Sequence, residues 1–396
     1  MKILFLVTED WYFVSHRLRL AQAARSAGAE VVVMTHVTGH GHELDYHGFK
    51  VIPWRISRRS LNPFREVSTF MQVLRAYRQE RPDLVHHVAL KPVVYGGLAS
   101  HLSGRMPNVN AIAGMGHVFT SNDSGMRFLR RPLLVLLRSA IAGKRNKIVL
   151  QNDEDRRFLV KNRIVRIENT AVIRGSGVNV NEFVPEPEPA GVPIVLLASR
   201  MIWEKGIGDF VKAAQLLRAQ KVRVRFVLVG KPDPENPGSI SEAQLREWTE
   251  GGVVEWWGHQ HNMPKVLSQA NVVCLPSAYG EGVPRILIEA AASGRAIVAT
   301  DAPGCRDVVC HGHNGFLVPV HDPQALANSI GQLVANPSQR TRMGARSRDL
   351  AVYGFSEEVI ISETLALYEE LTGLHWAEDL AGREKQADLS EASGHD

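Results

Sequence analysis

Short apolar runs alternate with longer amphipathic stretches along this chain, and the alternation occurs twice. The runs, rich in Val, Ile and Leu, lie at 3–7, 30–35, 84–88, 194–198, 223–230, 272–276 and 296–300. Helical patterns lie at 15–28, 64–81, 207–220 and 284–293. Strands that alternate with helices build parallel sheets covered by helices. The sequence therefore predicts an α/β fold made of two αβα halves.

A proline-rich stretch separates the two halves. The segment 183–191 reads FVPEPEPAG, and its prolines favour a semi-stiff extended connection because they resist both helix and sheet. The 396 residues also exceed one ordinary hydrophobic core and suit two domains. The predicted divisions are an N-terminal domain (1–182), a hinge (183–192), a C-terminal domain (193–355), a helix that crosses back over both domains (356–376) and a disordered tail (377–396).

Several sequence features favour a cytoplasmic protein. The N-terminal apolar run is too short for a secretion signal, because Glu9 and Asp10 follow it directly. The longest apolar run, 132–137, lies between arginines and is far shorter than the roughly 20 residues of a membrane-spanning helix. The cysteines number three and lack zinc-finger partners, so we expect buried, reduced thiols.

The segment 280–294 carries two glutamates around a predicted helix start. Pro284 suits the first helical position and Gly294 the position after the helix, so Glu281 falls in the preceding loop and Glu289 inside the helix. If the whole span were helical, the carboxylates would lie about 12 Å apart, beyond the roughly 5 to 9.5 Å of a glycosidase pair. They suit hydroxyls at opposite ends of an elongated ligand, with helix N–H groups between them for a diphosphate. That pattern indicates a nucleotide sugar.

The second motif is basic and follows the first strand of the C-terminal half. Arg200 and Lys205 lie at and beyond the end of the 194–198 run, separated by five positions. Ligands of doubly wound sheets bind at such strand ends. An arginine and a lysine there could neutralise a leaving diphosphate without a metal ion.

These motifs resemble those of the family 4 retaining glycosyltransferases, and the resemblance covers nearly the whole chain. Glu281 and Glu289 resemble the family's E-x7-E element, Arg200 and Lys205 its R-x4-K clamp, and 175–185 its interdomain stretch. The segments 60–64, 203–206 and 304–307 resemble bacterial members that extend undecaprenyl-diphosphate-linked sugars. The resemblance implies the GT-B fold, in which two Rossmann-like αβα domains face each other across a cleft.

The resemblance also implies roles for individual residues. Glu289 would hold the ribose hydroxyls, Glu281 would contact the transferred sugar, and Arg200 and Lys205 would stabilise the departing diphosphate. A first-domain histidine close to the donor sugar would be His117. The remaining donor-binding residues would be Gly230, Gly282 and Val283, the last two through their backbone N–H groups.

The acceptor side departs from the family pattern. The usual Gly-Gly loop after the first strand is missing, since residues 8–13 read TEDWYF. We expect Ser15, His16 and Arg17 to begin the first helix, where a hydroxyl, an imidazole and a guanidinium could meet an acceptor diphosphate.

Two other clusters have simpler interpretations. The spacing of Asp153 and Asp155 is that of metal-using transferases, but N-terminal capping of a helix explains it better, so we expect no metal. His86 and His87, at a strand end, are interpreted as a buried pair whose polar atoms bond to backbone.

A basic amphipathic stretch at 126–147 has two possible functions. It could lie on an anionic bilayer as a polyprenyl acceptor requires, with Arg55, Arg58, Arg59 and Arg65 extending the surface, or it could be a packed helix with a solvated basic face. The formal charge of +5 and a pI near 9.1 suit acidic partners in general.

The resemblance therefore predicts a hexosyltransferase without a metal or other cofactor. It would move a hexose or N-acetylhexosamine, with retention, from a nucleotide sugar such as a UDP-sugar to a polyprenyl-diphosphate-linked saccharide or related glycan. A nucleotide-sugar epimerase of GT-B architecture would need acid and base groups that the sequence does not identify. A dehydrogenase is not favoured, because this chain lacks the G-x-G-x-x-G motif after its first strand. A polyanion-binding protein leaves the paired glutamates unexplained, and no nucleic-acid partner is expected.

Overall fold

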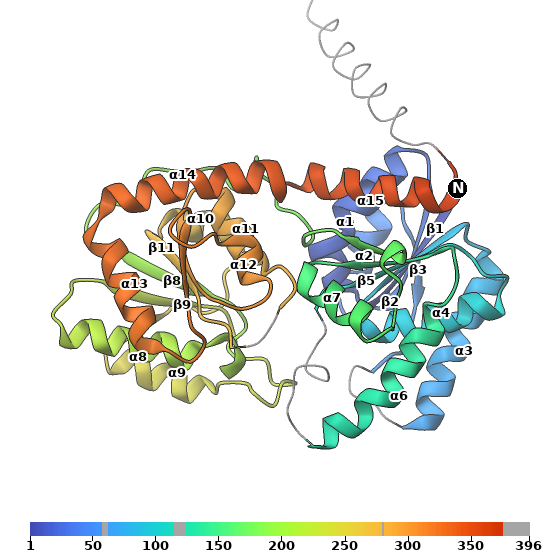
Figure 1. Cartoon of the computed structure of the whole chain (residues 1–396), viewed down its shortest axis with the longest axis horizontal. Helices are drawn as coiled ribbons and strands as arrows, with labels where there is room; N and C mark the ends of the chain where they lie inside the picture. The colour runs from blue at the N-terminus through green and yellow to red at the C-terminus, as the bar shows by residue number, and fades with distance from the viewer. Residues whose placement is uncertain (58–61, 115–123, 279–280, 375–396) are drawn as a thin grey trace, which may run out of the picture. The chain divides into compact units, whose positions relative to one another are not determined.

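The computed structural model describes residues 1–57, 62–114, 124–278 and 281–374, and within 124–131 only the backbone. The chain forms two compact units. The first contains Met1–Ser176 and the part from Glu358 onward, and the second contains Gly177–Glu357. Figure 1 shows the elements of each unit.

The first unit is a parallel sheet with helices on both faces. Its strands pair in the order β3-β2-β1-β4-β5-β6-β7. Its elements are β1 (Lys2–Glu9), α1 (Asp10–Ser26), β2 (Glu30–His36), α2 (Gly41–Tyr46), β3 (Lys50–Pro53), α3 (Pro63–Glu80), β4 (Leu84–Val88), α4 (Leu90–Leu102), β5 (Asn108–Ile112), α6 (Ser124–Ala140), β6 (Asn146–Leu150), α7 (Asp153–Lys161), η1 (Ile167–Asn169), β7 (Thr170–Val172) and α15 (Glu357–Thr372).

Alternating side chains of the first unit's strands fill two separate cores. Phe5 of β1 packs in the core with Phe13 of α1 and Tyr368 of α15, whereas Leu4 packs in the other core with Tyr77 of α3. This alternation is what a strand covered on both faces requires. The C-terminal helix α15 thus belongs to the core of the N-terminal unit, and Figure 1 shows it beside α1.

The second unit repeats the plan, with strands in the order β10-β9-β8-β11-β12-β13. Its elements are β8 (Ile194–Ala198), η2 (Trp203–Lys205), α8 (Ile207–Ala219), β9 (Arg225–Val229), α9 (Glu242–Glu250), β10 (Glu255–Trp256), α10 (Met263–Ser268), β11 (Val272–Leu275), α11 (Arg285–Ala292), β12 (Ala296–Thr300), α12 (Cys305–Val308), β13 (Gly315–Val318), α13 (Pro323–Ala335) and α14 (Pro337–Gly354). Both orders are those of doubly wound, Rossmann-like sheets, so the predicted fold class is confirmed.

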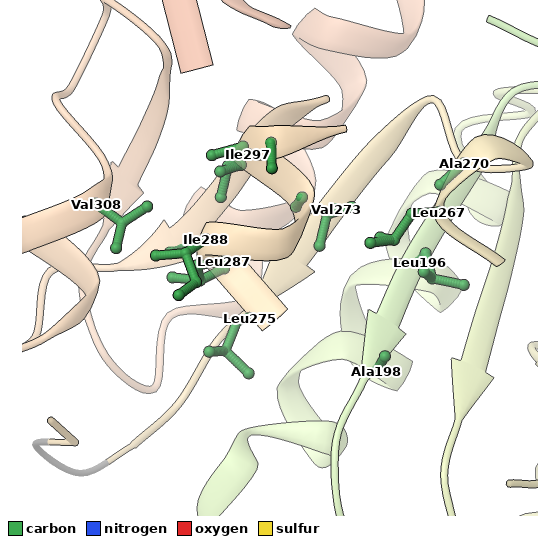
Figure 2. Packing of buried hydrophobic residues seen from close by; sticks show 14 of the residues in the cluster. Leu196, Ala198, Leu267, Ala270, Val273, Leu275, Leu287, Ile288, Ile297 and Val308 are labelled. Carbon is green, nitrogen blue, oxygen red and sulfur yellow. The ribbon is translucent and has the colours of Figure 1, made fainter. Parts of the chain in front are cut away.

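Helix α11, which carries one of the two predicted glutamates, is anchored in the second unit's core. Figure 2 shows Leu287 and Ile288 of α11 among Leu275 of β11 and Ile297 of β12, and all four are at most 1% exposed. Burial of each such side chain contributes about 1.5–3 kcal/mol. The helix, and with it Glu289, is therefore held firmly to the sheet.

The proline-rich stretch is attached to the second unit. Phe183 is buried in that unit's core, and Glu188 accepts hydrogen bonds from Arg340 Nη2 (2.6 Å) and Asn271 Nδ2 (3.0 Å). These contacts explain why the chain passes into the second unit after Ser176, earlier than the predicted hinge at 183–192. It returns to the first unit after Glu357, close to the predicted boundary after 355. The predicted tail, 377–396, lies outside the described residues.

Three local expectations are corrected. Helix α1 begins at Asp10, because strand β1 runs directly into it, so Ser15 to Arg17 lie in its second turn and not at its start. Helix α6 ends at Ala140, so the stretch 141–147 is a loop followed by the start of β6. Cys274 and Cys305 are buried as expected, but Cys310 is exposed. Within the described ranges, no helix combines the length and apolar character needed to cross a bilayer.

His86 and His87 are buried, but their hydrogen-bond partners are side chains and not backbone groups, and among the described residues His86 Nε2 has no partner. His86 Nδ1 lies 2.5 Å from the Tyr368 hydroxyl, and His87 bonds to Tyr77 Oη (2.8 Å) and Asn110 Oδ1 (2.7 Å). Burial lowers the pKa of His87 to about 4, so the ring stays neutral. Their position is as predicted, and the error lay in the bonding partners.

We predict that Tyr368→Phe destabilises the chain by about 1–2 kcal/mol, because it leaves the buried His86 Nδ1 without its hydrogen bond. Urea unfolding at neutral pH measures the change. Tyr353→Phe, at a residue 81% exposed, is the matched control and should be neutral within about 0.5 kcal/mol. Equal unfolding midpoints for the two variants would contradict the assigned role of Tyr368.

Candidate functional site

The strand order of the second unit creates a switch point between β8 and β11. The chain turns from β8 toward β9 on one side, and from β11 toward β12 on the other. Loops after the two strands therefore diverge and leave room for a ligand at their carboxyl ends. Arg200 and Lys205 follow β8, and Glu281 follows β11, so three of the predicted site residues lie at this point.

Lys205 and Glu281 form a shielded ion pair across the switch point. Lys205 Nζ lies 2.5 Å from Glu281 Oε2, and the side chains are 12% and 13% exposed. Each charge has lost most of its water, so removing one partner leaves the other unfavourably buried. The pair places a cation and a carboxylate acceptor side by side.

Two glycines bring the loops of this pair together. At Gly206 (φ +73°), an added Cβ would lie 1.8 Å from the carbonyl oxygen of Pro276, just after β11. At Gly304 (φ +81°), it would lie 1.6 Å from the carbonyl oxygen of Gly282. Only glycine permits both the backbone angle and the close approach. The Glu281 loop is therefore held between the turn after β8 and the start of α12.

Arg200 is on the same edge but is more exposed. Its Nη1 donates to Asp233 Oδ2 at 2.7 Å, and the arginine side chain is 52% exposed. An exposed ion pair contributes little to stability. Arg200 can therefore exchange Asp233 for an anionic ligand at small cost.

Glu289 lies within α11, as predicted, and is 7% exposed. Pro284 is the N-cap of this helix, one residue earlier than predicted. Arg285 Nε donates to Glu289 Oε1 at 2.7 Å. Burial raises the pKa of the Glu289 carboxyl, Arg285 opposes the shift, and Glu182 adds to it. A carboxylate whose burial costs folding free energy in this way is typical of a binding group.

The other predicted donor residues have unequal structural support. Gly230 ends β9 at φ +135°, its N–H donates to Gly258 and its carbonyl accepts from Trp256 Nε1. Both of its backbone groups are thus engaged within the protein, which favours a packing role. Gly282 and Val283 are buried between Glu281 and α11. His117 lies outside the described residues, so its role stays a prediction.

The acceptor-side candidates lie on one helix but face different environments. The Ser15 hydroxyl donates to the carbonyl of Trp11 (2.9 Å), and His16 stacks on Tyr12 with ring centroids 4.1 Å apart. Arg17 is only 6% exposed. Within the described chain, its guanidinium makes one hydrogen bond, to the His16 carbonyl, and no ion pair; its Nε is buried without a partner. A buried cation in this state is suited to receive an anion.

Two further features mark the carboxyl edge of the first unit. Asp10 is fully buried and accepts from the backbone N–H groups of Gly39 and His40. Burial opposes ionisation, but the hydrogen bonds from Thr38 and these N–H groups hold the pKa of Asp10 well below its usual range. Ala89, at the end of β4, has φ 81° and ψ 163°, a conformation that costs a non-glycine residue about 1–3 kcal/mol.

The D-x-D spacing belongs to a helix start. Asp153 is the first residue of α7 and pairs with Arg156, and Asp155 N–H donates to the N-cap Asn152 (2.7 Å). The predicted helix start is confirmed, but the N-cap is Asn152, and the aspartates lie in the first turn. The sequence analysis did not identify Asp233, Arg285 and Gly304 as partners of the site. Only Arg285, at helical spacing from Glu289, leaves a local signal in the sequence.

We predict that Glu289→Gln gains stability relative to the native chain as pH rises. The raised pKa of Glu289 means that its protonated form favours folding at low pH, and that this contribution is lost as pH rises through the raised pKa. The amide does not titrate. The variant-minus-native difference in unfolding free energy should therefore become more positive between about pH 4 and pH 7.5.

Urea titrations at the two pH values measure this difference. Glu242→Gln, at an exposed glutamate on α9, serves as the control. A flat or falling difference for Glu289→Gln would mean that burial does not perturb this carboxyl.

Family models match both halves of the chain. The model described as "Glycosyl transferase 4-like" matches residues 2–152, and "Glycosyl transferases group 1" matches residues 192–336. The chain is 26% identical over 384 residues to the N,N'-diacetylbacillosaminyl-diphospho-undecaprenol alpha-1,3-N-acetylgalactosaminyltransferase of Campylobacter jejuni, covering 94% of this chain and 99% of that protein. It is also 26% identical to a phosphatidyl-myo-inositol mannosyltransferase of Mycolicibacterium smegmatis, covering 91% and 90%.

A solved structure agrees with the fold. The Anabaena protein HepE in complex with UDP superimposes with a TM-score of 0.74 at 21% identity, covering 94% of this chain and all of that one. The family motifs, the two Rossmann-like units and the matches to both halves lead to one assignment. The chain belongs to the GT-B glycosyltransferases, with a 4-like N-terminal half and a group 1 C-terminal half, and it is an enzyme of that class.

Proposed function

We propose that the chain transfers a hexose or N-acetylhexosamine from a nucleotide-diphosphate sugar, with UDP as the first candidate, to a polyprenyl-diphosphate-linked saccharide or related glycan. The observation that carries the proposal is the Lys205–Glu281 pair at the switch point of the second unit, with Arg200 beside it. A relative named for a diphospho-undecaprenol acceptor and a related fold solved with UDP support the same choice.

The donor diphosphate would lie against Lys205 and Arg200. Lys205 is shielded from water, so its charge acts on a nearby phosphate more strongly than an exposed lysine would. Arg200 would leave Asp233 and bind the phosphate oxygens in a fork. Two cations positioned in this way can stabilise the leaving diphosphate, which is why we propose transfer without a metal ion.

The two glutamates would hold the ends of the donor. Glu281, whose loop is clamped by Gly304, would accept from a hydroxyl of the transferred sugar. Glu289 would accept from the ribose hydroxyls, and its buried charge would then gain the hydrogen bonds that burial denies it. We propose retention through front-face attack, with the leaving diphosphate taking the acceptor's proton, so that the protein supplies positioning and charge.

Arg17 is the strongest acceptor-side candidate. Its buried guanidinium would form charge-assisted hydrogen bonds with the acceptor's diphosphate, which would supply the anion that the described chain does not. The strained Ala89, at the end of the neighbouring strand β4, supports a ligand site at this edge. Ser15 and His16 would contribute only from the exposed side of the same helix.

A lipid-linked acceptor also calls for contact with a membrane surface. Helix α3 exposes Phe64 (85%), Val67 (61%) and Met71 (47%), which share one face at helical spacing. Helices α3, α4 and α6 lie side by side on one face of the sheet (Figure 1). Exposed apolar side chains near arginines such as Arg65 and Arg75 suit an anionic bilayer, so we propose peripheral membrane contact on this side.

We predict acceptor-dependent release of one nucleotide diphosphate when the purified chain is tested against UDP-, GDP- and ADP-sugars. The reaction would contain EDTA and a short polyprenyl-diphosphate-linked saccharide. Glu281→Gln should lower kcat by about 100-fold or more, because it removes a donor contact and the ion pair with Lys205. Glu242→Gln, an exposed control, should retain native turnover.

Each other outcome leads to a different conclusion. Activity that disappears in EDTA and returns with Mg²⁺ would overturn the metal-free mechanism. An isomerised nucleotide sugar formed without acceptor would favour the epimerase. Absence of any nucleotide release with every donor would end the transferase proposal for these substrates.

We predict that Arg17→Lys raises the acceptor KM by about 10-fold or more while the donor KM stays unchanged, because a lysine cannot form the forked contact to a diphosphate. Initial rates at varied acceptor and donor concentrations measure the two constants. An acceptor KM equal to that of the native chain, in a variant with a native unfolding midpoint, would exclude Arg17 from acceptor binding.

A further inference from the structure

A basic pocket lies at the amino edge of the first unit's sheet, away from the strand ends described above. It occupies about 690 Å³ where β5 and β6 begin, between the end of α4 and the loop after α6. Its basic lining residues are His101, Arg105, Lys144 and Arg145, and among the described residues no acidic side chain lines it. Arg105, Lys144 and Arg145 are exposed, and within the described chain none of their side chains forms an ion pair.

The base of the pocket contains a polar atom without a partner. Asn108 is 1% exposed, and among the described residues its Oδ1 has no hydrogen bond. Its amide orientation is fixed, because Nδ2 donates to Asn146 Oδ1 and Asn146 Nδ2 donates to Ala142 O. Asn108, a residue of the pocket lining, therefore keeps a buried, unsatisfied acceptor that a ligand hydroxyl reaching it would satisfy. Cations at the rim and an acceptor at the base suit a phosphate that carries hydroxyl groups.

The walls of the pocket are tied together. One ring nitrogen of His101 lies 2.7 Å from Gly97 O in α4, and the other lies 2.9 Å from Ala142 O in the loop after α6. Arg105 is held in the left-handed region at φ +58°, where its N–H donates to Ser100 O (2.8 Å). A residue persists in this conformation only where the surrounding structure determines it. The rim cation Arg105 is thus fixed on the backbone and not on a loose loop.

Exposed apolar side chains lie close in sequence to residues of the pocket lining. Leu102, next to His101, is 59% exposed. On α6, Val135 is 64% and Leu136 47% exposed, and they precede the pocket residue Ser139 by four and three positions. Residues at these spacings share a helix face. A phosphate in the pocket would therefore lie beside an apolar strip formed by Leu102, Val135 and Leu136.

We infer that this pocket binds the headgroup phosphate of an anionic glycerophospholipid. The headgroup hydroxyls would bond to Asn108 Oδ1, Arg105, Lys144 and Arg145 would surround the phosphate, and the acyl chains would lie along Leu102, Val135 and Leu136. The apolar strip favours a lipid over a free phosphate, because a soluble anion would leave it in water. The inference rests on the membrane contact proposed above and adds a specific site to it.

Vesicle flotation of the full chain tests the inference. Phosphatidylcholine vesicles with and without phosphatidylglycerol would be compared for the native chain, for R105E/K144E and for V135S/L136S. We expect the native chain to float with phosphatidylglycerol vesicles. Each double variant should bind them at least about 10-fold more weakly. K221E/R223E, which reverses two exposed charges on the second unit, is the matched control and should float like the native chain.

The outcomes separate the inference from the proposals on which it rests. If the native chain floats and both pocket variants float equally well, the headgroup site is overturned while membrane contact stands. If the native chain does not float, both are overturned. If glycerol 1-phosphate in solution protects Lys144 from acylation but vesicles do not, the pocket is a free-anion site and the lipid assignment fails. Transfer to a short-chain acceptor without vesicles should stay native in the pocket variants, which keeps this test apart from the catalytic one.

Discussion

Both units depend on one constraint, which is that parallel strands gather their carboxyl ends at a single edge. In the second unit this edge joins residues that are far apart in sequence: Lys205 and Glu281, separated by 76 positions, meet at 2.5 Å because β8 and β11 are neighbours in the sheet. The close approach of Gly206 to Pro276 and of Gly304 to Gly282 then leaves the two loops no alternative positions. The chemistry of the site is thus a consequence of strand order first and of side-chain identity second.

The same edges carry several charges whose burial is unfavourable. Glu289 is buried with its pKa raised, Lys205 and Glu281 are shielded from water, and Arg17 is a buried cation without an acidic partner in the described chain. Each of these arrangements costs folding free energy that an apolar side chain of similar size would not. The buried His87, by contrast, is hydrogen-bonded through both ring nitrogens, to Tyr77 and Asn110. The contrast indicates that the edge charges are held ready for a ligand.

Local patterns in the sequence were sufficient to predict much of the fold. The alternation of apolar runs and helical stretches gave the two αβα units, and the proline and glycine around 284–294 placed Glu281 in a loop and Glu289 in a helix. Such features depend on neighbours within a few residues, so one sequence contains them. The helix start at Asp10 was missed, because Asp10 is stabilised there by the loop at 38–40, almost thirty residues away.

Partners that come from distant segments could not be predicted in the same way. Asp233 meets Arg200 only because the loop after β9 returns to the end of β8, and Tyr368 meets His86 only because α15 rejoins the first unit. Nothing in the spacing of these residues signals the contact. The basic pocket is a further case. His101 and Arg105 come from the end of α4 and the loop after it, and Lys144 and Arg145 from the loop before β6; they form one surface because β5 and β6 are adjacent.

The first unit separates its two charged regions by using opposite edges of one sheet. Asp10 and the strained Ala89 mark the carboxyl edge, where β1 and β4 end, whereas the basic pocket opens where β5 and β6 begin. A parallel sheet keeps these edges a full strand length apart, which for five-residue strands is about 16 Å. A lipid headgroup at the amino edge and an acceptor diphosphate near Arg17 would therefore not compete for the same cations. An enzyme that takes a lipid-linked acceptor from a membrane rich in anionic lipid needs this separation, because otherwise the abundant lipid would occupy the acceptor's binding site.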